Sequence, residues 1–328
     1  MRIIITGGGG FLGSRLCDAL LQREQLTGPS GQPESIDQIA LFDARFHRSS
    51  EDDRVQQVTG DISDRDNVFD LVGNREDTAI FHLASMVSGE CEEHFDAALA
   101  VNLDGGRHLF EAVRTLPGRP RLVFASSIGT YGGEGMVPVN SDLTKQTPQT
   151  TYGVTKAICE LLLNDYSRKG YFDGRSVRLP TVIIRPGKPN AAASSWASGM
   201  FREPLQGEDC LLPINRDQRH PITSYRTAIA SFIALHEVPA TALGSDRAFV
   251  LPAHTITPRL AEAALQEVAA ERGLQLGTIQ DAFDPHIQGI VDNWSQAIDG
   301  SRALALGIPQ PPALKQILLD FFDDYGPA

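Results

Sequence analysis

Three side chains near the middle of the chain have the chemistry of a proton-transfer site: Ser127, Tyr152 and Lys156. Tyr152 and Lys156 are four positions apart, so on a helix their side chains lie on one face, one turn from each other. A phenol is a useful general base only when its pKa falls well below the usual value of about 10. A serine hydroxyl beside it can hold a substrate oxygen by hydrogen bonds.

The lysine is the group expected to lower that pKa. An ammonium ~4 Å from a phenolate, at an effective dielectric constant of ~20, stabilises the charge by on the order of 4 kcal/mol. This energy corresponds to roughly 3 pKa units, which predicts that Tyr152 titrates near neutrality. The same spacing also occurs on ordinary solvated helices, so the prediction depends on the elements that place these residues.

A glycine-rich turn at the start of the chain predicts where a cofactor binds. The run Thr6–Gly13 follows a β-branched strand and opens a helix. In a dinucleotide-binding turn the first glycine supplies free dihedrals, a middle one lets the backbone approach a pyrophosphate, and the last lets the helix pack on the strand. Unpaired amides at the helix N-terminus favour phosphate groups. The candidate cofactor residues here are Gly7, Gly10, Phe11, Leu12 and Gly13.

Asp43 ends the second predicted strand, where a dinucleotide fold binds the ribose hydroxyls of adenosine. It lies about 30 residues beyond the glycines instead of the usual ~20, because the segment Gln22–Ser35, expected to be an exposed loop, is inserted between them. A carboxylate repels a 2′-phosphate, which favours NAD over NADP, although Arg45 favours the opposite. Further cofactor candidates follow the third and fourth strands: Asp61, Ile62, Leu83 and Ser85.

Short apolar runs alternate with segments of helical period over the first 185 residues. Because strands separated by helices pair in parallel, this order predicts an α/β fold with a Rossmann-type doubly wound sheet. The predicted strands are Arg2–Thr6, Ile39–Phe42, Val55–Thr59, Ala79–Leu83, Arg121–Ser126 and Val177–Ile184, and the predicted helices are Phe11–Leu21, Asp64–Val72, His94–Arg114 and Tyr152–Ser167.

Beyond residue 185 the chain becomes rich in Pro and Gly, with shorter helices expected at Thr223–His236 and Pro258–Arg272 and an amphipathic helix at Leu314–Tyr325. We therefore predict an NAD-binding domain at residues 1–185 and a smaller substrate-binding domain at residues 186–328. A strand at Ala248–Leu251 is a candidate addition to the first sheet.

Composition excludes several classes of partner. The 328 residues include 29 basic and 41 acidic side chains, and the net charge of -12 repels nucleic acid and anionic lipid. No apolar stretch approaches about 18 residues and no secretion signal precedes the first strand, so we expect a cytoplasmic protein without a membrane partner. The four cysteines are far apart and lack metal-ligand spacing, which predicts reduced thiols and no metal: Cys17, Cys91, Cys159 and Cys210.

Taken together, these motifs resemble the extended short-chain dehydrogenase/reductase superfamily, which includes NAD-dependent sugar-nucleotide epimerases and dehydratases. The resemblance implies that Tyr152 is the general base, that Lys156 binds the nicotinamide ribose and lowers the pKa of the phenol, and that Ser127 holds the substrate. It also places Asn102 and Pro186 near the cofactor, Asn102 as a support for the loop beside the nicotinamide. The matching peptides are Thr6–Gly13, Asp43, Asp61–Ile62, Val101–Asn102 with Gly105, Ser127, Tyr152, Lys156, Arg185–Pro186, Asp299–Ala303 and Leu306–Gly307.

Two stretches, Thr147–Gly153 and Arg178–Ser195, are similar to the D-erythronate dehydrogenase branch of that superfamily. Members of this branch oxidise a four-carbon sugar acid at C2 to the 2-oxo acid with NAD, so the resemblance implies a small sugar acid as the substrate. A cation is then expected for the carboxylate. Lys188 and Asn190, in the loop after the sixth strand, are the first candidates for this role, and Arg226 is a weaker one.

Two other functions stay open. A sugar-nucleotide 4-epimerase or dehydratase would retain NAD and return the hydride, but the segment Ser126–Gly129 lacks the acidic pair typical of dehydratases. A non-catalytic NAD-sensing regulator would often lose the tyrosine or the lysine, and this chain keeps both Tyr152 and Lys156. A homodimer is the commonest assembly for a protein of this kind.

Overall fold

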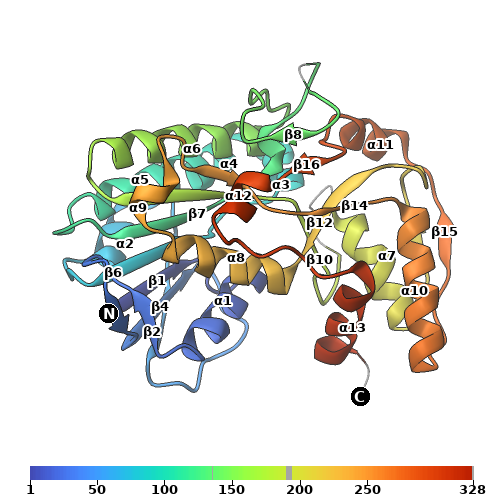
Figure 1. The fold of residues 1–328 in the computed structure, drawn as a ribbon, viewed down its shortest axis with the longest axis horizontal. Helices are drawn as coiled ribbons and strands as arrows, with labels where there is room; N and C mark the ends of the chain where they lie inside the picture. The colour runs from blue at the N-terminus through green and yellow to red at the C-terminus, as the bar shows by residue number, and fades with distance from the viewer. Residues whose placement is uncertain (135, 190–193, 327–328) are drawn as a thin grey trace.

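The computed structural model describes residues 1–134, 136–189 and 194–326. Its centre is a parallel sheet of seven strands in the order β13-β9-β7-β6-β1-β4-β5, which confirms the predicted α/β, doubly wound fold (Figure 1). Because the seven strands are parallel, their carboxyl ends lie at one edge of the sheet. β1 lies between β4 and β6, and sheets in which the strand order reverses in this way bind ligands at that edge. The strands are β1 Arg2–Thr6, β4 Gln38–Asp43, β5 Val55–Thr59, β6 Thr78–His82, β7 Arg121–Ser127, β9 Asp173–Leu179 and β13 Ala248–Val250.

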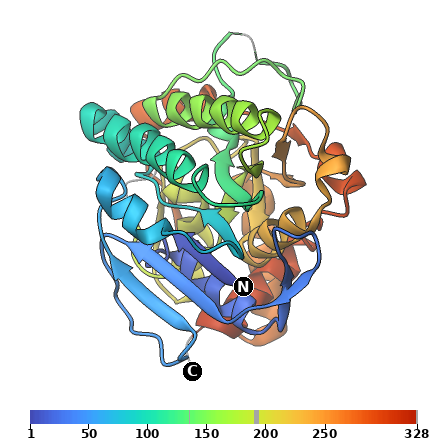
Figure 2. The same cartoon turned by 90° about the vertical axis from the view of Figure 1, so that its left-hand side faces the viewer.

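Helices cover both faces of this sheet (Figure 1, Figure 2). Successive side chains of a strand point to opposite faces, so Ile3 and Ile5 pack with α1 (Phe11–Leu21) and α8 (Tyr225–Glu237) in one core. Ile4 belongs to the core on the other face. The helices there are α2 Arg65–Val72, α5 Gly105–Val113 and α6 Thr151–Arg168. Near-continuous apolar strands are what burial on both faces requires.

A second lobe, with its own buried core, lies beside the carboxyl edge of the sheet (Figure 1). A three-stranded sheet in the order β10-β12-β14 forms its inner wall, and a short pair between β8 and β16 ties the two halves of the chain together. The elements of this region are β10 Thr181–Ile183, β12 His220–Ser224, β14 His254–Ile256, β11 Cys210–Leu212, β15 Ile279–Asp281, β8 Asn140–Ser141, β16 Ile298–Asp299, α7 Ser195–Leu205, α10 Pro258–Arg272, α11 Pro285–Asp292 and α13 Leu314–Tyr325. α12 (Ser301–Ala305) packs instead on β13 of the central sheet.

The predicted strand Val177–Ile184 is wrong as a single element. It is divided at Pro180 into β9, which belongs to the central sheet, and β10, which pairs with β12 in the second lobe. Proline has no amide hydrogen for a ladder bond, so it marks the point where the chain leaves one sheet for the other. β13 and α8, from the later half of the chain, return to the central sheet.

Two further predictions are corrected. The segment Gln22–Ser35 is not an exposed loop throughout, because β2 (Gln25–Thr27) and β3 (Pro33–Ser35) form an antiparallel hairpin that buries Leu26. The helix predicted over His94–Arg114 is interrupted: α4 (Phe95–Ala98) continues into a π-helical segment, Leu99–Asp104, before α5, and a separate α3 (Ser88–Glu93) precedes it. Such widened turns often occur at functional sites.

Within the described residues, no helix combines the length and apolar character needed to cross a membrane. Each of the four cysteines is a buried free thiol.

Candidate active site

Ser127 and Tyr152 line one cavity of about 710 Å³ at the carboxyl edge of the sheet. Ser127 ends β7 and faces Leu179 of β9 in the ladder, and the chain from Leu179 to Val182 forms the next part of the wall. Residues of β12 and α11 complete the opposite side. The cavity therefore lies between the central sheet and the second lobe, and its volume is in the range of small-molecule sites.

The start of α6 places Tyr152 beside Ser127. Thr150 caps the helix, because its hydroxyl oxygen accepts a hydrogen bond from the amide of Gly153 at 3.1 Å. A Cβ at Gly153 would stand 2.1 Å from the carbonyl oxygen of Gly129, so only glycine lets the helix dock on this turn. Gly129 in turn donates its amide hydrogen to the Ser127 Oγ at 3.0 Å, which leaves the hydroxyl hydrogen of Ser127 to face the phenol of Tyr152.

Lys156 lies behind the tyrosine and is 3% exposed. Its Nζ donates to the carbonyl oxygen of Ala125 at 2.9 Å and lies 5.4 Å from the ring centroid of Tyr152. The predicted one-face arrangement of phenol and ammonium is therefore present. Burial lowers the pKa of Lys156 to about 8.

The predicted near-neutral pKa of Tyr152 is wrong for the protein alone. Burial raises the pKa of the phenol to about 12, and the hydrogen bond with Ser127 opposes this only in part. The lysine does not offset the burial because its ammonium lies over the ring and is bound to a carbonyl oxygen. Activation of Tyr152 at neutral pH therefore needs a further positive charge next to the phenol.

One turn beyond Lys156, Glu160 anchors α6 in a buried network. Both of its carboxylate oxygens accept bonds from Arg178 of β9, the shortest at 2.8 Å, and Gln146 donates to it at 2.6 Å. Arg178 also donates to the hydroxyl of Tyr131 at 2.8 Å. Because Glu160 and Arg178 are almost fully buried, removal of either would leave an unpaired buried charge.

The glycine turn has the shape of a phosphate cradle. Gly7 has a φ of +73°, and a Cβ there would meet the Ala84 amide at 2.7 Å. A Cβ at Gly13 would stand 2.1 Å from the carbonyl oxygen of Gly7, whereas Gly10 is exposed and meets little. No side chain caps the N-terminus of α1, so amides of its first turn, which includes Phe11 and Leu12, remain for an anion. These residues fit the pyrophosphate of a dinucleotide.

Asp43, at the end of β4, is held against this turn. Its carboxylate accepts from the amide of Gly9 at 3.0 Å and from the amide of Arg45 at 3.3 Å. The half-buried carboxylate is thus placed beside the phosphate cradle, as ribose recognition requires.

The other cofactor candidates follow neighbouring strands. Asp61 is exposed and accepts from the amide of Ser63 at 2.8 Å, and Ile62 is buried. Leu83 donates its amide hydrogen to the carbonyl oxygen of Thr6, whereas Ser85 bonds to the next residue along the chain. Pro186 is half-buried, three residues after β10.

Asn102, in the π-helical segment, is buried and bonds to the main chain at Met86 through both its Oδ1, at 2.8 Å, and its Nδ2, at 3.3 Å. Its geometry is that of a support for the loop after β6.

The candidates for a carboxylate cation are not brought to the cavity. Lys188 is exposed and its carbonyl oxygen accepts from Arg185, and it does not contribute to the cavity wall. Asn190 lies outside the described residues. Arg226 pairs with Asp320 and Asp324.

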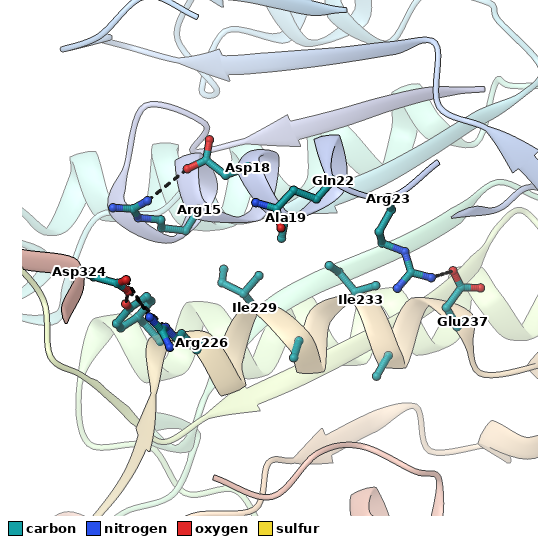
Figure 3. Close-up of a pocket in the computed structure, with 13 residues that line it drawn as sticks. Arg15, Asp18, Ala19, Gln22, Arg23, Arg226, Ile229, Ile233, Glu237 and Asp324 are labelled. Carbon is teal, nitrogen blue, oxygen red and sulfur yellow. Dashed lines mark hydrogen bonds and ion pairs between the residues drawn. The ribbon is translucent and has the colours of Figure 1, made fainter. Parts of the chain in front are cut away.

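Arg226 lines a different groove, of about 610 Å³, between α1 and α8 on the surface of the first lobe (Figure 3). Its apolar floor includes Ile229 and Ile233, and ion pairs such as Arg23 with Glu237 occupy the rim. Neither Ser127 nor Tyr152 contributes to this groove. It therefore plays no part in the proton-transfer site.

Sequence reasoning missed the residues of the far wall, among them Thr181, His220 and Trp294. Thr181 begins β10 and His220 begins β12, and the parallel pairing of these strands brings the two side chains within 2.6 Å. No sequence motif connects them. The signal that was available is Pro180, which ends β9 and directs the following residue away from the central sheet.

Comparison with known proteins agrees with this geometry. Residues 3–245 match the NAD dependent epimerase/dehydratase family. The chain is 41% identical over 326 residues to the D-erythronate dehydrogenase of Cupriavidus necator, covering 99% of both chains, and 38% identical to that of Haemophilus influenzae, covering 98% of this chain and 99% of the relative. A solved structure, the nucleoside-diphosphate-sugar epimerase from Agrobacterium tumefaciens, is 34% identical with a TM-score of 0.89 over 99% of this chain and 94% of that chain. The chain therefore belongs to the NAD dependent epimerase/dehydratase family and is an NAD-dependent oxidoreductase.

Proposed function

We propose that the protein oxidises the C2 hydroxyl of a small sugar acid of the D-erythronate type to the 2-oxo acid, with NAD as the hydride acceptor. The observation that carries this proposal is the cavity itself, in which Ser127 and Tyr152 line the same space at the edge of the sheet that holds the glycine turn. Identity over nearly the full length to two D-erythronate dehydrogenases supports the substrate class.

In the proposed reaction Tyr152 accepts the proton of the substrate hydroxyl. Ser127 donates to the same oxygen and orients it: its Oγ accepts the Gly129 amide, and its hydroxyl hydrogen, which faces the phenol in the protein alone, turns to the substrate. Lys156 keeps the phenol in place from behind. The glycine turn and Asp43 would hold NAD, which would supply the hydride acceptor and a positively charged ring that lowers the pKa of Tyr152.

We further propose that the two parts of the chain have different roles, one in binding the cofactor and one in binding the substrate. Residues 1–185 supply the NAD site, and residues 186–328 together with β10 supply the wall that faces the substrate, including His220 and Trp294. α8 and β13 of the second segment nevertheless pack on the first sheet, so the boundary in space does not follow the boundary in the chain.

A sugar-nucleotide 4-epimerase is the second candidate, since a structure of that description is 34% identical. A nucleoside diphosphate needs several cations or other strong donors for its phosphates. No arginine or lysine lines the cavity within the described residues, and residues 135, 190–193 and 327–328 include neither type. A wall without arginine or lysine favours a ligand smaller than a nucleoside diphosphate, with fewer anionic groups to neutralise.

The test is NADH formation with a panel of four- and five-carbon aldonates, compared with a panel of nucleotide sugars. We expect turnover with at least one aldonate and none with the nucleotide sugars. Turnover of nucleotide sugars alone would overturn the proposal. Mass spectrometry of the denatured protein supplies a second readout, because stoichiometric retained NAD favours an epimerase. NAD binding without turnover of either panel would favour a non-catalytic sensor.

A further inference from the structure

His220 is a buried histidine on the wall of the cavity, with only one of its ring nitrogens bonded. It is 1% exposed, and its Nε2 lies 2.6 Å from the Oγ1 of Thr181, which is half-buried on the same wall. The Nδ1 has no hydrogen-bond partner. Unsatisfied buried ring nitrogens are uncommon and need a reason.

Aromatic rings enclose the imidazole on two sides. The ring centroids of Trp196 and Trp294 lie 5.2 Å and 5.5 Å from that of His220. Across the antiparallel pair, His220 faces Ile256 of β14. These neighbours are uncharged, and burial among them lowers the pKa of His220 to about 4. The protein alone therefore holds His220 neutral at physiological pH.

The charged residues around the cavity explain why Thr181 and His220 are important for binding an acid. Glu92 and Glu93 of α3 are the carboxylates on its wall, and they repel an anion. Arginine and lysine are missing from the described wall. A buried carboxylate without a cation or strong donors is costly. Among the described residues of the wall, two can become positively charged: His220 and the exposed His286 of α11.

We propose that Thr181 and His220 form the subsite for the carboxylate of the substrate acid, and that His220 takes up a proton as the anion binds. This inference rests on the proposed function, since it assumes an anionic substrate. The carboxylate then lies toward β10 and β12, in the second lobe, while Ser127 and Tyr152 engage the hydroxyl that is oxidised. Thr181 donates its hydroxyl hydrogen to the same anion.

Proton uptake by His220 determines how the KM for the acid changes with pH. The anion raises the pKa of His220 above its value of about 4, so the complex holds a proton that the free enzyme does not hold. The KM for the acid therefore increases by up to about tenfold per pH unit as the pH rises from about 4 toward the pKa of His220 in the complex, and it levels off above that pKa.

The experiment compares the acid with its neutral amide as substrates of the NAD-loaded enzyme. His220→Asn and Thr181→Val are expected to raise the KM for the acid by about 10- to 100-fold, the loss of a hydrogen bond to a charged group, with kcat changed by less than about threefold. The KM for the amide should be nearly unchanged. His254→Asn on the adjacent strand β14 is the control, because His254 bonds to the carbonyl oxygen of Pro312 and does not line the cavity.

Proton uptake is the second measurement. Calorimetry of acid binding to the enzyme–NADH complex, in buffers of different ionisation enthalpy near about pH 6, should show net uptake with the wild type and none with His220→Asn. An unchanged KM for the acid in both variants, an equal change for acid and amide, or no uptake by the wild type overturns the inference while leaving the proposed function intact. Failure of the wild type to oxidise any sugar acid overturns both. Thermal unfolding of each variant checks that it folds, and Thr181→Val, which keeps the side-chain shape, remains informative if His220→Asn does not.

Discussion

Replacement of Lys156 by Met is expected to abolish turnover while making the protein more stable at neutral pH. Burial lowers the pKa of the Lys156 ammonium from 10.5 to about 8. At 1.36 kcal/mol per pKa unit, the charged side chain reduces the free energy of unfolding by roughly 3 kcal/mol. Methionine fills a similar volume without charge, and the lost bond to the Ala125 carbonyl costs about 1 kcal/mol. The net expected gain is about 2 kcal/mol.

The pH dependence separates this explanation from a simple packing effect. Between the folded and unfolded pKa values of Lys156 the unfolded state binds more protons, so the wild type becomes more stable as the pH rises through that interval. The variant lacks this rise, and the difference between the two proteins should close between about pH 8 and pH 10.

Urea unfolding without NAD, at about pH 7 and at about pH 10, measures both quantities. Lys169→Met is the matched control, because Lys169 is exposed at the end of the same helix, and it should change stability by less than about 0.5 kcal/mol. A variant at Lys156 that is less stable than the wild type at neutral pH, or a difference that does not depend on pH, would refute the reasoning.

Two further predictions concern the same helix. Tyr152→Phe should lower kcat by about 100-fold or more, the contribution of a general base, and leave the dissociation constant of NAD nearly unchanged; initial rates and a binding titration measure these, and full activity would exclude the assigned role. Arg178→Met should leave the buried carboxylate of Glu160 unpaired and lower the free energy of unfolding by about 3–5 kcal/mol. Urea unfolding should also show that the double variant Arg178→Met/Glu160→Leu recovers most of that loss, whereas a single-variant loss below about 1 kcal/mol would contradict the proposed network.

Much of the first lobe could be predicted because most of its strands are buried on both faces. Arg2–Thr6 has the same bounds in the structure as in the prediction, since a buried parallel strand is a short apolar segment between helical periods. Val55–Thr59 also keeps its predicted bounds, although it forms the partly exposed edge strand β5. The hairpin β2–β3 could not be recognised in this way. Each of its strands has three residues, and Leu26 is the one fully buried side chain in them, so no periodicity indicates a strand.

The candidate site also contains residues whose arrangement local sequence patterns predict and residues whose arrangement they do not. The pair Tyr152 and Lys156 lies within one helix, so its spacing alone predicts its geometry. Thr181 and His220 are separated by 39 positions and meet only through strand pairing, which no local pattern reveals. Lys188 shows the converse error, because proximity in the chain to the end of a strand does not determine where a long side chain points.

The position of β13 at the end of the central sheet has a consequence for synthesis on the ribosome. β9 has one neighbour, β7, until residues 248–250 arrive, and these leave the ribosome about 70 residues after β9 ends, a delay of several seconds at roughly 5–20 residues per second. During that interval the nascent chain carries an unpaired parallel edge, the kind of surface that recruits other strands. Once β13 pairs, the edge of the sheet is a strand of three residues instead of the seven of β9, and short edge strands limit pairing between chains. A fragment that ends near residue 185 would keep the longer edge permanently.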